Sequence, residues 1–173
     1  MKIAKFWLVL CVVLVLICIL FVGLSVSRKT VPFVENEYYK VIYVVDGDTF
    51  KVKVKDKIAI IRMLGINTPE TLDPRKRDEC YGKQASQESK KILDNANVRF
   101  ELSPNREVMD KYGRYLAYVY TENGLFLNKY LVSKGFAREY TYGKAYSKQI
   151  EFKNLEKKAK KDKLGLWGIC SNK

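Results

Sequence analysis

The chain has 173 residues, contains no histidine, and carries 32 Lys and Arg residues against 19 Asp and Glu residues, a formal net charge of +13 at pH 7. The lack of histidine excludes a Ser-His-Asp triad and a His-ligated zinc site, so any general base must be a carboxylate, Lys, Tyr or Cys. The charge indicates an anionic partner such as nucleic acid, a membrane surface or a wall polymer, with a merely soluble basic surface as the alternative.

A long uncharged segment occupies residues 6–26. A length of about 20 residues favours a membrane-spanning helix that stays as an anchor, and a long signal peptide that is cleaved is the alternative. We therefore expect a signal or anchor segment over residues 1–26, a linker over residues 27–37 and one domain over residues 38–170. Basic residues flank the segment on both sides, so its orientation is not settled by charge, and a domain outside the cytoplasm, secreted or anchored at the cell surface, is the default expectation.

Strict alternation predicts a half-buried strand that begins near Asp48 and ends at Val54. Asp48 heads the row that contains Phe50 and Val52, and lysines dominate the opposite row. A carboxylate at the head of an apolar row is costly unless a cation pairs with it. We therefore expect a positively charged partner for Asp48.

The next strand is expected over residues 58–66, with its even-numbered residues forming an apolar face that Arg62 interrupts. A guanidinium in such a row needs a carboxylate or a phosphate as its partner. Asn67, Thr68 and Glu70 follow where this strand ends.

Pairing of these two strands would bring Asp48, Arg62, Asn67 and Glu70 together at one end of the strand pair, which we call the mouth. For Asp48 and Arg62 alone, a structural ion pair under a turn is the simpler interpretation. Two carboxylates, an arginine and an amide at one strand end instead indicate a metal-assisted phosphodiester site.

The remaining pattern predicts a small domain of five strands and three helices. Further strands are expected over residues 38–45, 98–102 and 115–120, and helices over residues 81–95, 125–134 and 147–162. We therefore expect an α+β fold, a five-stranded closed barrel of the OB type with three helices, preceded by one N-terminal hydrophobic helix. Barrels of this type commonly offer one face to oligonucleotides.

Other candidate ligands of nucleic acid stand outside this mouth. Arg114 immediately precedes a strand and is a second candidate for binding phosphate, although alone it would be an ordinary surface arginine. Tyr140, Tyr142 and Tyr146 cluster near Lys144. Aromatic residues among basic residues can stack the bases of a single strand, and half-buried loop tyrosines explain the cluster equally well.

Two of the four cysteines, Cys80 and Cys170, lie in the expected domain. A disulfide between them would suit an exported protein and would tie the C-terminus to the body of the domain. Two free thiols would look the same in the sequence, so both states stay open.

Five blocks of sequence, in order and at compatible spacing, resemble the staphylococcal nuclease (thermonuclease) family. These blocks lie within residues 46–49, 62–71, 81–85, 110–118 and 159–167. The resemblance covers about residues 38–167. It implies an OB barrel that acts as a monomeric domain, with Ca2+ as cofactor. It also implies an endonuclease that does not discriminate between ribose and deoxyribose, so that both DNA and RNA are cleaved, as single strands or breathing duplexes, and 3′-phosphate ends are left.

Carried over position by position, the resemblance implies that Asp48 ligates calcium by its carboxylate and Thr68 by its backbone carbonyl. Asn67 stands where the well-known member of the family has aspartate. Its amide oxygen can still ligate calcium, but one negative charge is missing, so weaker calcium binding is expected. Glu70 would hold the attacking water and take its proton.

The resemblance also assigns roles to basic and aromatic residues. Arg62 and Arg114 would clamp the scissile phosphate and stabilise the transition state. The resemblance implies contacts to nucleotide or phosphate by Lys111, Tyr112 and Tyr140. Tyr142 is added to these expected contacts because it belongs to the tyrosine cluster.

Two other functions stay open at this point. The first is a catalytically silent, membrane-anchored OB module that holds nucleic acid, and Asn67 is the feature that favours it. The second is a cationic protein that binds anionic lipid or wall polymer without chemistry. It explains the charge, but it leaves Asp48 and Arg62 inside apolar rows unexplained.

Overall fold

The computed structural model describes residues 7, 33–34, 36–71, 79–104 and 107–170. Apart from Trp7, they all belong to one unit, Pro32–Lys173. The expected hydrophobic helix over residues 6–26 and most of the expected linker lie outside the described residues. Within the described part of the chain, no helix is both long enough and apolar enough to cross a membrane.

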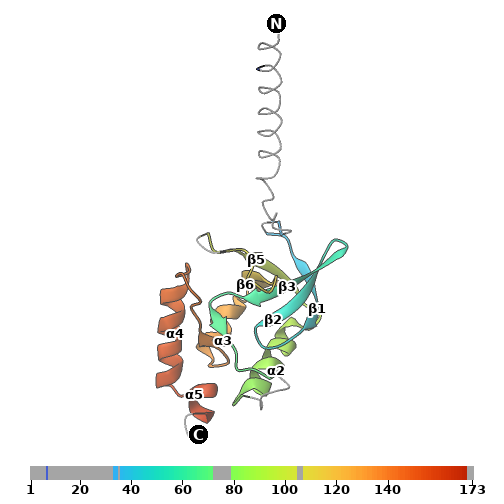
Figure 1. Ribbon diagram of the computed structural model, residues 1–173. Helices are drawn as coiled ribbons and strands as arrows, with labels where there is room; N and C mark the ends of the chain where they lie inside the picture. The colour runs from blue at the N-terminus through green and yellow to red at the C-terminus, as the bar shows by residue number, and fades with distance from the viewer. Residues whose placement is uncertain (1–6, 8–32, 35, 72–78, 105–106, 171–173) are drawn as a thin grey trace. The chain divides into compact units, whose positions relative to one another are not determined.

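Five strands close into a barrel in the order β1-β2-β3-β6-β5 (Figure 1). Their bounds are Tyr39–Val44 (β1), Thr49–Val54 (β2), Lys57–Met63 (β3), Asn97–Glu101 (β5) and Tyr115–Thr121 (β6). Neighbouring strands are antiparallel except β3 and β6, which are parallel. This arrangement confirms the predicted five-stranded barrel of the OB type.

The helices follow the predicted order. They are Gly82–Leu93 (α2), Leu127–Ser133 (α3), Gln149–Lys161 (α4) and a short α5, Leu166–Ile169. Helix α3 packs against β6 and against α4, so it lies between α4 and the barrel (Figure 1). A separate two-stranded sheet joins β4 (Ile66–Asn67) to β7 (Arg138–Glu139). The short helix α5 and this small sheet are additions to the predicted elements.

The barrel core contains the row predicted for β2. Phe50 and Val52 are fully buried, and Asp48, just before the strand, is 4% exposed. On the opposite face Lys53 is exposed and Lys51 is half-buried. The alternation in β2 therefore gave the correct faces.

The face predicted for β3 was wrong. Ala59, Ile61 and Met63 point into the core, whereas Ile58 is 63% exposed and Arg62 is half-buried. The cause is the pairing with β2, because directly opposed residues share one face of a sheet. Phe50 is opposite Ile61 and Val52 is opposite Ala59, so the odd-numbered residues of β3 join the core.

The single expected strand over residues 58–66 is in fact two strands separated by a turn. Strand β3 ends at Met63, and Gly65 has φ +80°, a conformation that glycine adopts without steric cost. Asn128 of α3 holds this turn, since its amide donates to the carbonyl of Leu64 (2.9 Å). The turn directs β4 away from the barrel, and this places Asn67 beside β7 instead of beside β2.

Candidate active site

Asp48 is the centre of the polar cluster at the end of β2 and β3. Its Oδ2 forms an ion pair with Nη2 of Arg62 (3.0 Å) and accepts a hydrogen bond from the backbone N–H of Thr68 (2.8 Å). Its Oδ1 accepts from the hydroxyl of Thr49 (3.0 Å). The buried carboxylate is thus fully supported, and it fastens the chain after β4 to the barrel mouth.

Arg62 is held by acceptors from four residues at this mouth. Its Nη1 donates to the carbonyl oxygens of Met63 (3.0 Å) and Ile66 (2.8 Å), and its Nη2 donates to Oδ1 of Asn67 (2.8 Å). Together with the ion pair to Asp48, these bonds fix the plane of the guanidinium. The four Nη hydrogens of Arg62 therefore all have acceptors within the protein, so a phosphate would have to replace one or more of these partners to bind the end of the guanidinium.

The polar side chains of this region line a small cavity of about 220 Å³. It is lined by Asp46, Asp48, Arg62, Asn67, Thr68, Pro69, Glu70, Arg114 and Tyr140. The structure therefore brings together all six residues that the sequence placed in catalytic or metal-binding roles. Tyr140, expected to contact substrate, joins them because its backbone N–H donates to the carbonyl of Gly65 (3.0 Å).

Asp46 also lines this cavity, although the sequence did not predict it as a site residue. Its Oδ1 accepts a hydrogen bond from the backbone N–H of Asp48 (3.0 Å). Burial, followed by the negative charge of Asp48, raises the pKa of Asp46 to about 7. The Asp-x-Asp spacing was the available signal, because a tight turn brings two carboxylates with this spacing to one side.

The oxygen atoms of this cavity suit a hard divalent cation. They are the carboxylates of Asp46 and Asp48, the amide of Asn67 and the backbone carbonyl of Thr68. The raised pKa of Asp46 shows that charge is poorly compensated there, which a bound cation would relieve. No group of three or more Cys, Asp or Glu residues placed to hold a metal occurs within the described ranges. A cation here would therefore depend on neutral oxygen atoms and water as well.

Arg114 approaches the cavity from the turn before β6. Its Nε donates to Oδ2 of Asp110 (2.7 Å), whose Oδ1 accepts from the backbone N–H of Arg114 (3.0 Å) and of Tyr112 (2.9 Å). Burial favours the neutral acid, but these hydrogen bonds outweigh it and lower the pKa of Asp110. The bond uses Nε, so the Nη groups at the end of the guanidinium can serve a phosphate. Asp110 is a second residue that the sequence reasoning had not singled out.

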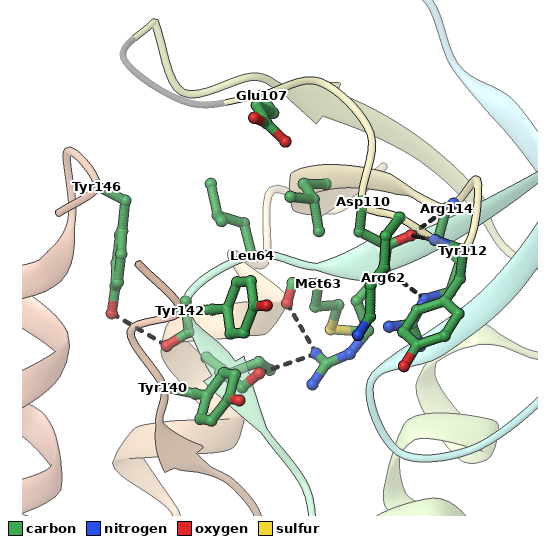
Figure 2. A pocket seen from close by; sticks show the side chains of 14 residues that line it. Arg62, Met63, Leu64, Glu107, Asp110, Tyr112, Arg114, Tyr140, Tyr142 and Tyr146 are labelled. Carbon is green, nitrogen blue, oxygen red and sulfur yellow. Dashed lines mark hydrogen bonds and ion pairs between the residues drawn. The ribbon is translucent and has the colours of Figure 1, made fainter. Parts of the chain in front are cut away.

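A larger cavity of about 430 Å³ adjoins Arg62 and carries the aromatic residues. Figure 2 shows Tyr140 and Tyr142 on one side of Arg62 and Tyr112 on the other. Tyr112 and Tyr142 are 70% and 66% exposed, and the ammonium of Lys111 lies 5.0 Å from the ring centre of Tyr112. The exposed rings and the charged groups offer stacking surfaces beside Arg62.

The third member of the tyrosine cluster has a different place. Tyr146 is 6% exposed, and its hydroxyl donates to the carbonyl of Gly65 (3.0 Å) and lies 3.0 Å from the carboxylate of Glu139. Burial, followed by the charge of Glu139, raises the pKa of Tyr146. Tyr146 therefore supports the turn under the cavity, while Tyr140 and Tyr142 face its opening.

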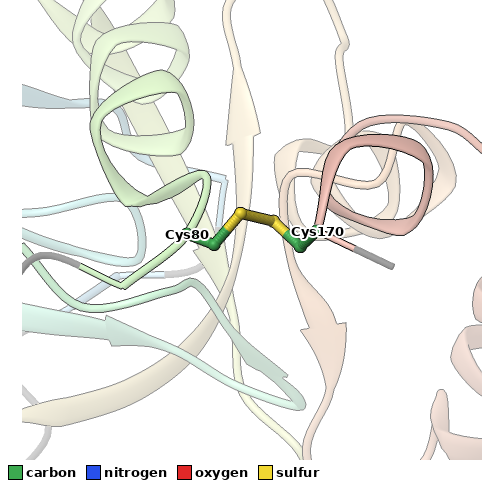
Figure 3. Close-up of a disulfide and its surroundings, with 2 residues drawn as sticks. All are labelled: Cys80 and Cys170. Carbon is green, nitrogen blue, oxygen red and sulfur yellow. A yellow bond between two sulfur atoms is a disulfide. The ribbon is translucent and has the colours of Figure 1, made fainter. Parts of the chain in front are cut away.

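Glu70 lies at the edge of the small cavity and is exposed. Its Oε1 accepts a hydrogen bond from the backbone N–H of Thr71 (3.2 Å), and its own backbone N–H donates to the carboxylate of Glu79 (3.2 Å). Glu79 precedes Cys80, which forms a disulfide with Cys170 (Figure 3).

A closed five-stranded barrel with helices, whose mouth carries carboxylates and two arginines, defines an OB-type protein. The chain belongs to the staphylococcal nuclease family. The family model described as "Staphylococcal nuclease homologue" matches residues 60–168, which contain Arg62, Glu70 and Arg114.

Individual relatives support the same assignment over most of the chain. The thermonuclease of Staphylococcus hyicus is 35% identical over 162 residues, 90% of this chain and 94% of that protein. The thermonuclease of Staphylococcus intermedius is 38% identical over 140 residues, 81% of this chain and 82% of that protein. Endonuclease YncB of Bacillus subtilis is 36% identical over 124 residues, 71% of this chain and 58% of that protein.

Proposed function

We propose that this protein is a calcium-dependent endonuclease that hydrolyses phosphodiester bonds in both DNA and RNA and leaves 3′-phosphate ends. The observation that carries the proposal is the convergence of Asp48, Arg62, Glu70 and Arg114 on one small cavity. The relatives named thermonuclease and endonuclease support it from outside the structure.

The metal would be held by Asp48, Asp46, the amide oxygen of Asn67 and the carbonyl of Thr68. When bound, a divalent cation neutralises charge on a non-bridging phosphate oxygen and lowers the pKa of a coordinated water. Because Oδ2 of Asp48 is paired with Arg62, a cation at Asp48 would weaken that ion pair and release Nη2 of Arg62 for the substrate.

Arg62 and Arg114 would bind the scissile phosphate from two elements, β3 and the turn before β6. Negative charge on the phosphate oxygens increases as the water attacks, so two fixed guanidinium groups stabilise the transition state more than the bound substrate. Asp110 would orient Arg114, and the carbonyl oxygens of Met63 and Ile66 would orient Arg62.

Glu70 would accept the proton of the attacking water. The water oxygen forms a bond to phosphorus while the bond from phosphorus to the 5′-oxygen breaks, and the 5′-oxygen leaves as a hydroxyl after taking a proton from solvent. The products are a 3′-phosphate and a 5′-hydroxyl. The exposed position of Glu70 at the cavity edge supports this role, since a water molecule can reach it.

The adjoining larger cavity would bind the nucleotides next to the cleaved bond. Tyr112, Tyr140 and Tyr142 would stack bases, and Lys111 would contact a phosphate. Stacking on these rings requires unpaired bases, so single strands and breathing duplexes are the expected substrates. The sugar makes no obligatory contact in this scheme, and RNA and DNA should both be cleaved.

Export of the domain completes the proposal. A disulfide is typical of proteins that leave the cytoplasm. The uncharged composition of residues 6–26 suits either a retained membrane anchor or a cleaved signal peptide. We propose that the protein acts as a monomer, secreted or attached to the cell surface.

Cleavage of oligonucleotides tests the proposal directly. The full-length protein is incubated with single-stranded DNA and with RNA, in calcium or in chelator, beside Glu70→Gln. We expect calcium-dependent cleavage with 3′-phosphate ends and a kcat that is lower by about 100-fold or more in the variant, because the general base is lost. Glu122→Gln, at an exposed residue outside both cavities, is the control. Binding without cleavage at every calcium concentration would leave the silent OB module as the function.

A further inference from the structure

The segment that carries Glu70 is braced by the residues just before α2. The backbone N–H of Glu79 donates to the carbonyl of Glu70 (2.9 Å), and the Glu79 carboxylate accepts from the backbone N–H of Glu70 (3.2 Å). Gly82 packs closely against the same segment, since a Cβ there would lie 2.6 Å from Cγ2 of Thr71 and 2.9 Å from the carbonyl oxygen of Glu70. Glu79 and Gly82 therefore hold the backbone of Glu70 on one side, while the bond from Thr68 to Asp48 fastens the chain just before it.

The disulfide fixes this bracing segment to a distant part of the chain. Cys80 directly follows Glu79 and is bonded to Cys170, which is 90 residues further along the chain (Figure 3). Cys170 is the residue that ends α5. The position of Glu79 is thus tied covalently to α5.

Helix α5 is in turn connected to the other side of the active site. The backbone N–H of Leu166 donates to the carbonyl of Gly135 (2.9 Å), and the guanidinium of Arg138 lies 5.0 Å from the ring centre of Trp167. Arg138 pairs with Asn67 in the sheet of β4 and β7. The disulfide therefore completes a connected series of contacts that leads from Asn67 through β7 and α5 to the segment that holds Glu70.

We propose that Glu79 and the Cys80–Cys170 disulfide form a brace that positions Glu70 for catalysis. The inference rests on the proposed role of Glu70 as the group that takes the proton from water. The side chain of Glu70 is exposed, and its Oε1 accepts a hydrogen bond from the backbone N–H of Thr71 in the same segment, so its position follows the position of that segment. A general base works only within hydrogen-bonding distance of the water, so small displacements lower kcat strongly. Glu79, Cys80 and Cys170 act through Glu70 and are positioning residues.

Two sets of variants of the full-length protein separate positioning from general stability. The double variant Cys80→Ser/Cys170→Ser removes the bridge without leaving a free thiol at either end. Glu79→Ala removes the acceptor for the backbone N–H of Glu70, and Glu79→Gln, which keeps an acceptor oxygen, is its matched control. For each variant, kcat and KM are measured well below its unfolding temperature, with the affinity for a phosphorothioate oligonucleotide in calcium.

We expect kcat to fall by about tenfold or more in the double serine variant and in Glu79→Ala, because a misplaced general base slows only the chemical step. Oligonucleotide affinity should change by less than about twofold, and Glu79→Gln should retain most of the activity. When the serine pair is combined with Glu79→Ala, the fold-decrease in kcat should be smaller than the product of the two separate fold-decreases, since both changes act on one segment. An unchanged kcat, or a purely multiplicative loss, would overturn the brace.

Hydrogen exchange provides a readout that does not depend on activity. In the double serine variant, peptides that contain Glu70 and Thr71 should exchange faster, while peptides from β2 should keep their protection. Uniformly faster exchange, or none at Glu70, would contradict the brace even if kcat falls. If the unmodified protein cleaves no substrate, the proposed function fails, and the exchange pattern alone decides whether the brace exists.

Discussion

The identity of the side chain at position 67 determines how much negative charge the proposed cation site offers. Its side chain is a neutral amide whose Oδ1 accepts from Nη2 of Arg62 (2.8 Å), in a cavity that also contains Asp46 and Asp48. An amide oxygen can ligate calcium, but a carboxylate attracts it more strongly. We therefore expect the amide to give the proposed calcium site a lower affinity than an aspartate would, without removing a ligand.

The substitution Asn67→Asp should strengthen calcium binding. We expect the calcium concentration that gives half-maximal cleavage to fall by about tenfold, because a full negative charge is added within the cavity. A calcium titration of cleavage by the unmodified protein and the variant measures this. Asn123→Asp, at an exposed turn outside the cavity, controls for the change in net charge. Equal midpoints for the unmodified protein and Asn67→Asp would contradict the role given to Asn67.

Asp46 makes the stability of the metal-free protein depend on pH. Burial and the charge of Asp48 raise its pKa to about 7, whereas an aspartate in an unfolded chain titrates near 3.9. Between about pH 4 and pH 7 the folded protein therefore binds more protons than the unfolded chain. The contribution of Asp46 to the free energy of unfolding is fully present below pH 4 and is lost as the pH rises to 7, with a slope that approaches about 1.4 kcal/mol per pH unit.

Urea denaturation in chelator, from pH 4 to pH 8, measures this contribution. Asp46→Asn keeps an oxygen for the backbone N–H of Asp48 but does not titrate. The free energy of unfolding of the unmodified protein should fall relative to the variant as the pH rises through this window. Parallel pH profiles for the two proteins would show that Asp46 titrates normally in the folded state.

At the scale of elements, local patterns predicted the strands and helices well but assigned one face wrongly. The alternation in β2 is unambiguous because lysines mark its outer row. Residues 58–63 of β3 are apolar at both even and odd positions apart from Arg62, so the sequence contains no outer row to recognise. The face is decided by the register with β2, which places Ile61 opposite Phe50. Such pairing is a property of two strands and cannot be read from one.

The site, like the fold, was predictable where local sequence carries the signal and was not where contacts between distant segments decide. Asp48 was predictable because its charge stands at the head of a buried apolar row, whereas Arg62 was predicted correctly although the row in which it stands is the outer row of β3. Asp46 was not predicted as a site residue, since a carboxylate followed by glycine has an ordinary structural explanation in a tight turn. The contact of Gly135 with Leu164 and Gly165, where an added Cβ would lie 2.2 Å from the Leu164 carbonyl oxygen, depends on packing between distant segments. Gly135 directly follows the helix predicted over residues 125–134, and its φ of +72° is typical of a glycine just after a helix end.

At the scale of the whole molecule, the net charge of +13 raises the question of which charges bind nucleic acid. Counterion release depends on the phosphates that are neutralised, and not on the total charge. Lys111 lies at the larger cavity, whereas Lys53 lies on the outer face of β2, outside both cavities. Both lysines are exposed. They therefore form a matched pair that distinguishes local phosphate contacts from a general basic surface.

Binding of a fluorescent single-stranded phosphorothioate oligonucleotide, measured in calcium over a range of salt concentrations, makes this distinction. For single strands, the logarithm of the binding constant falls with the logarithm of the salt concentration with a slope of about −0.7 for each phosphate neutralised. Lys111→Ala should therefore make the slope less steep by about 0.7, and Lys53→Ala should leave it unchanged. Equal effects of the two substitutions would mean that the domain attracts nucleic acid with its whole surface, and that the cavity beside Arg62 does not select the bound strand.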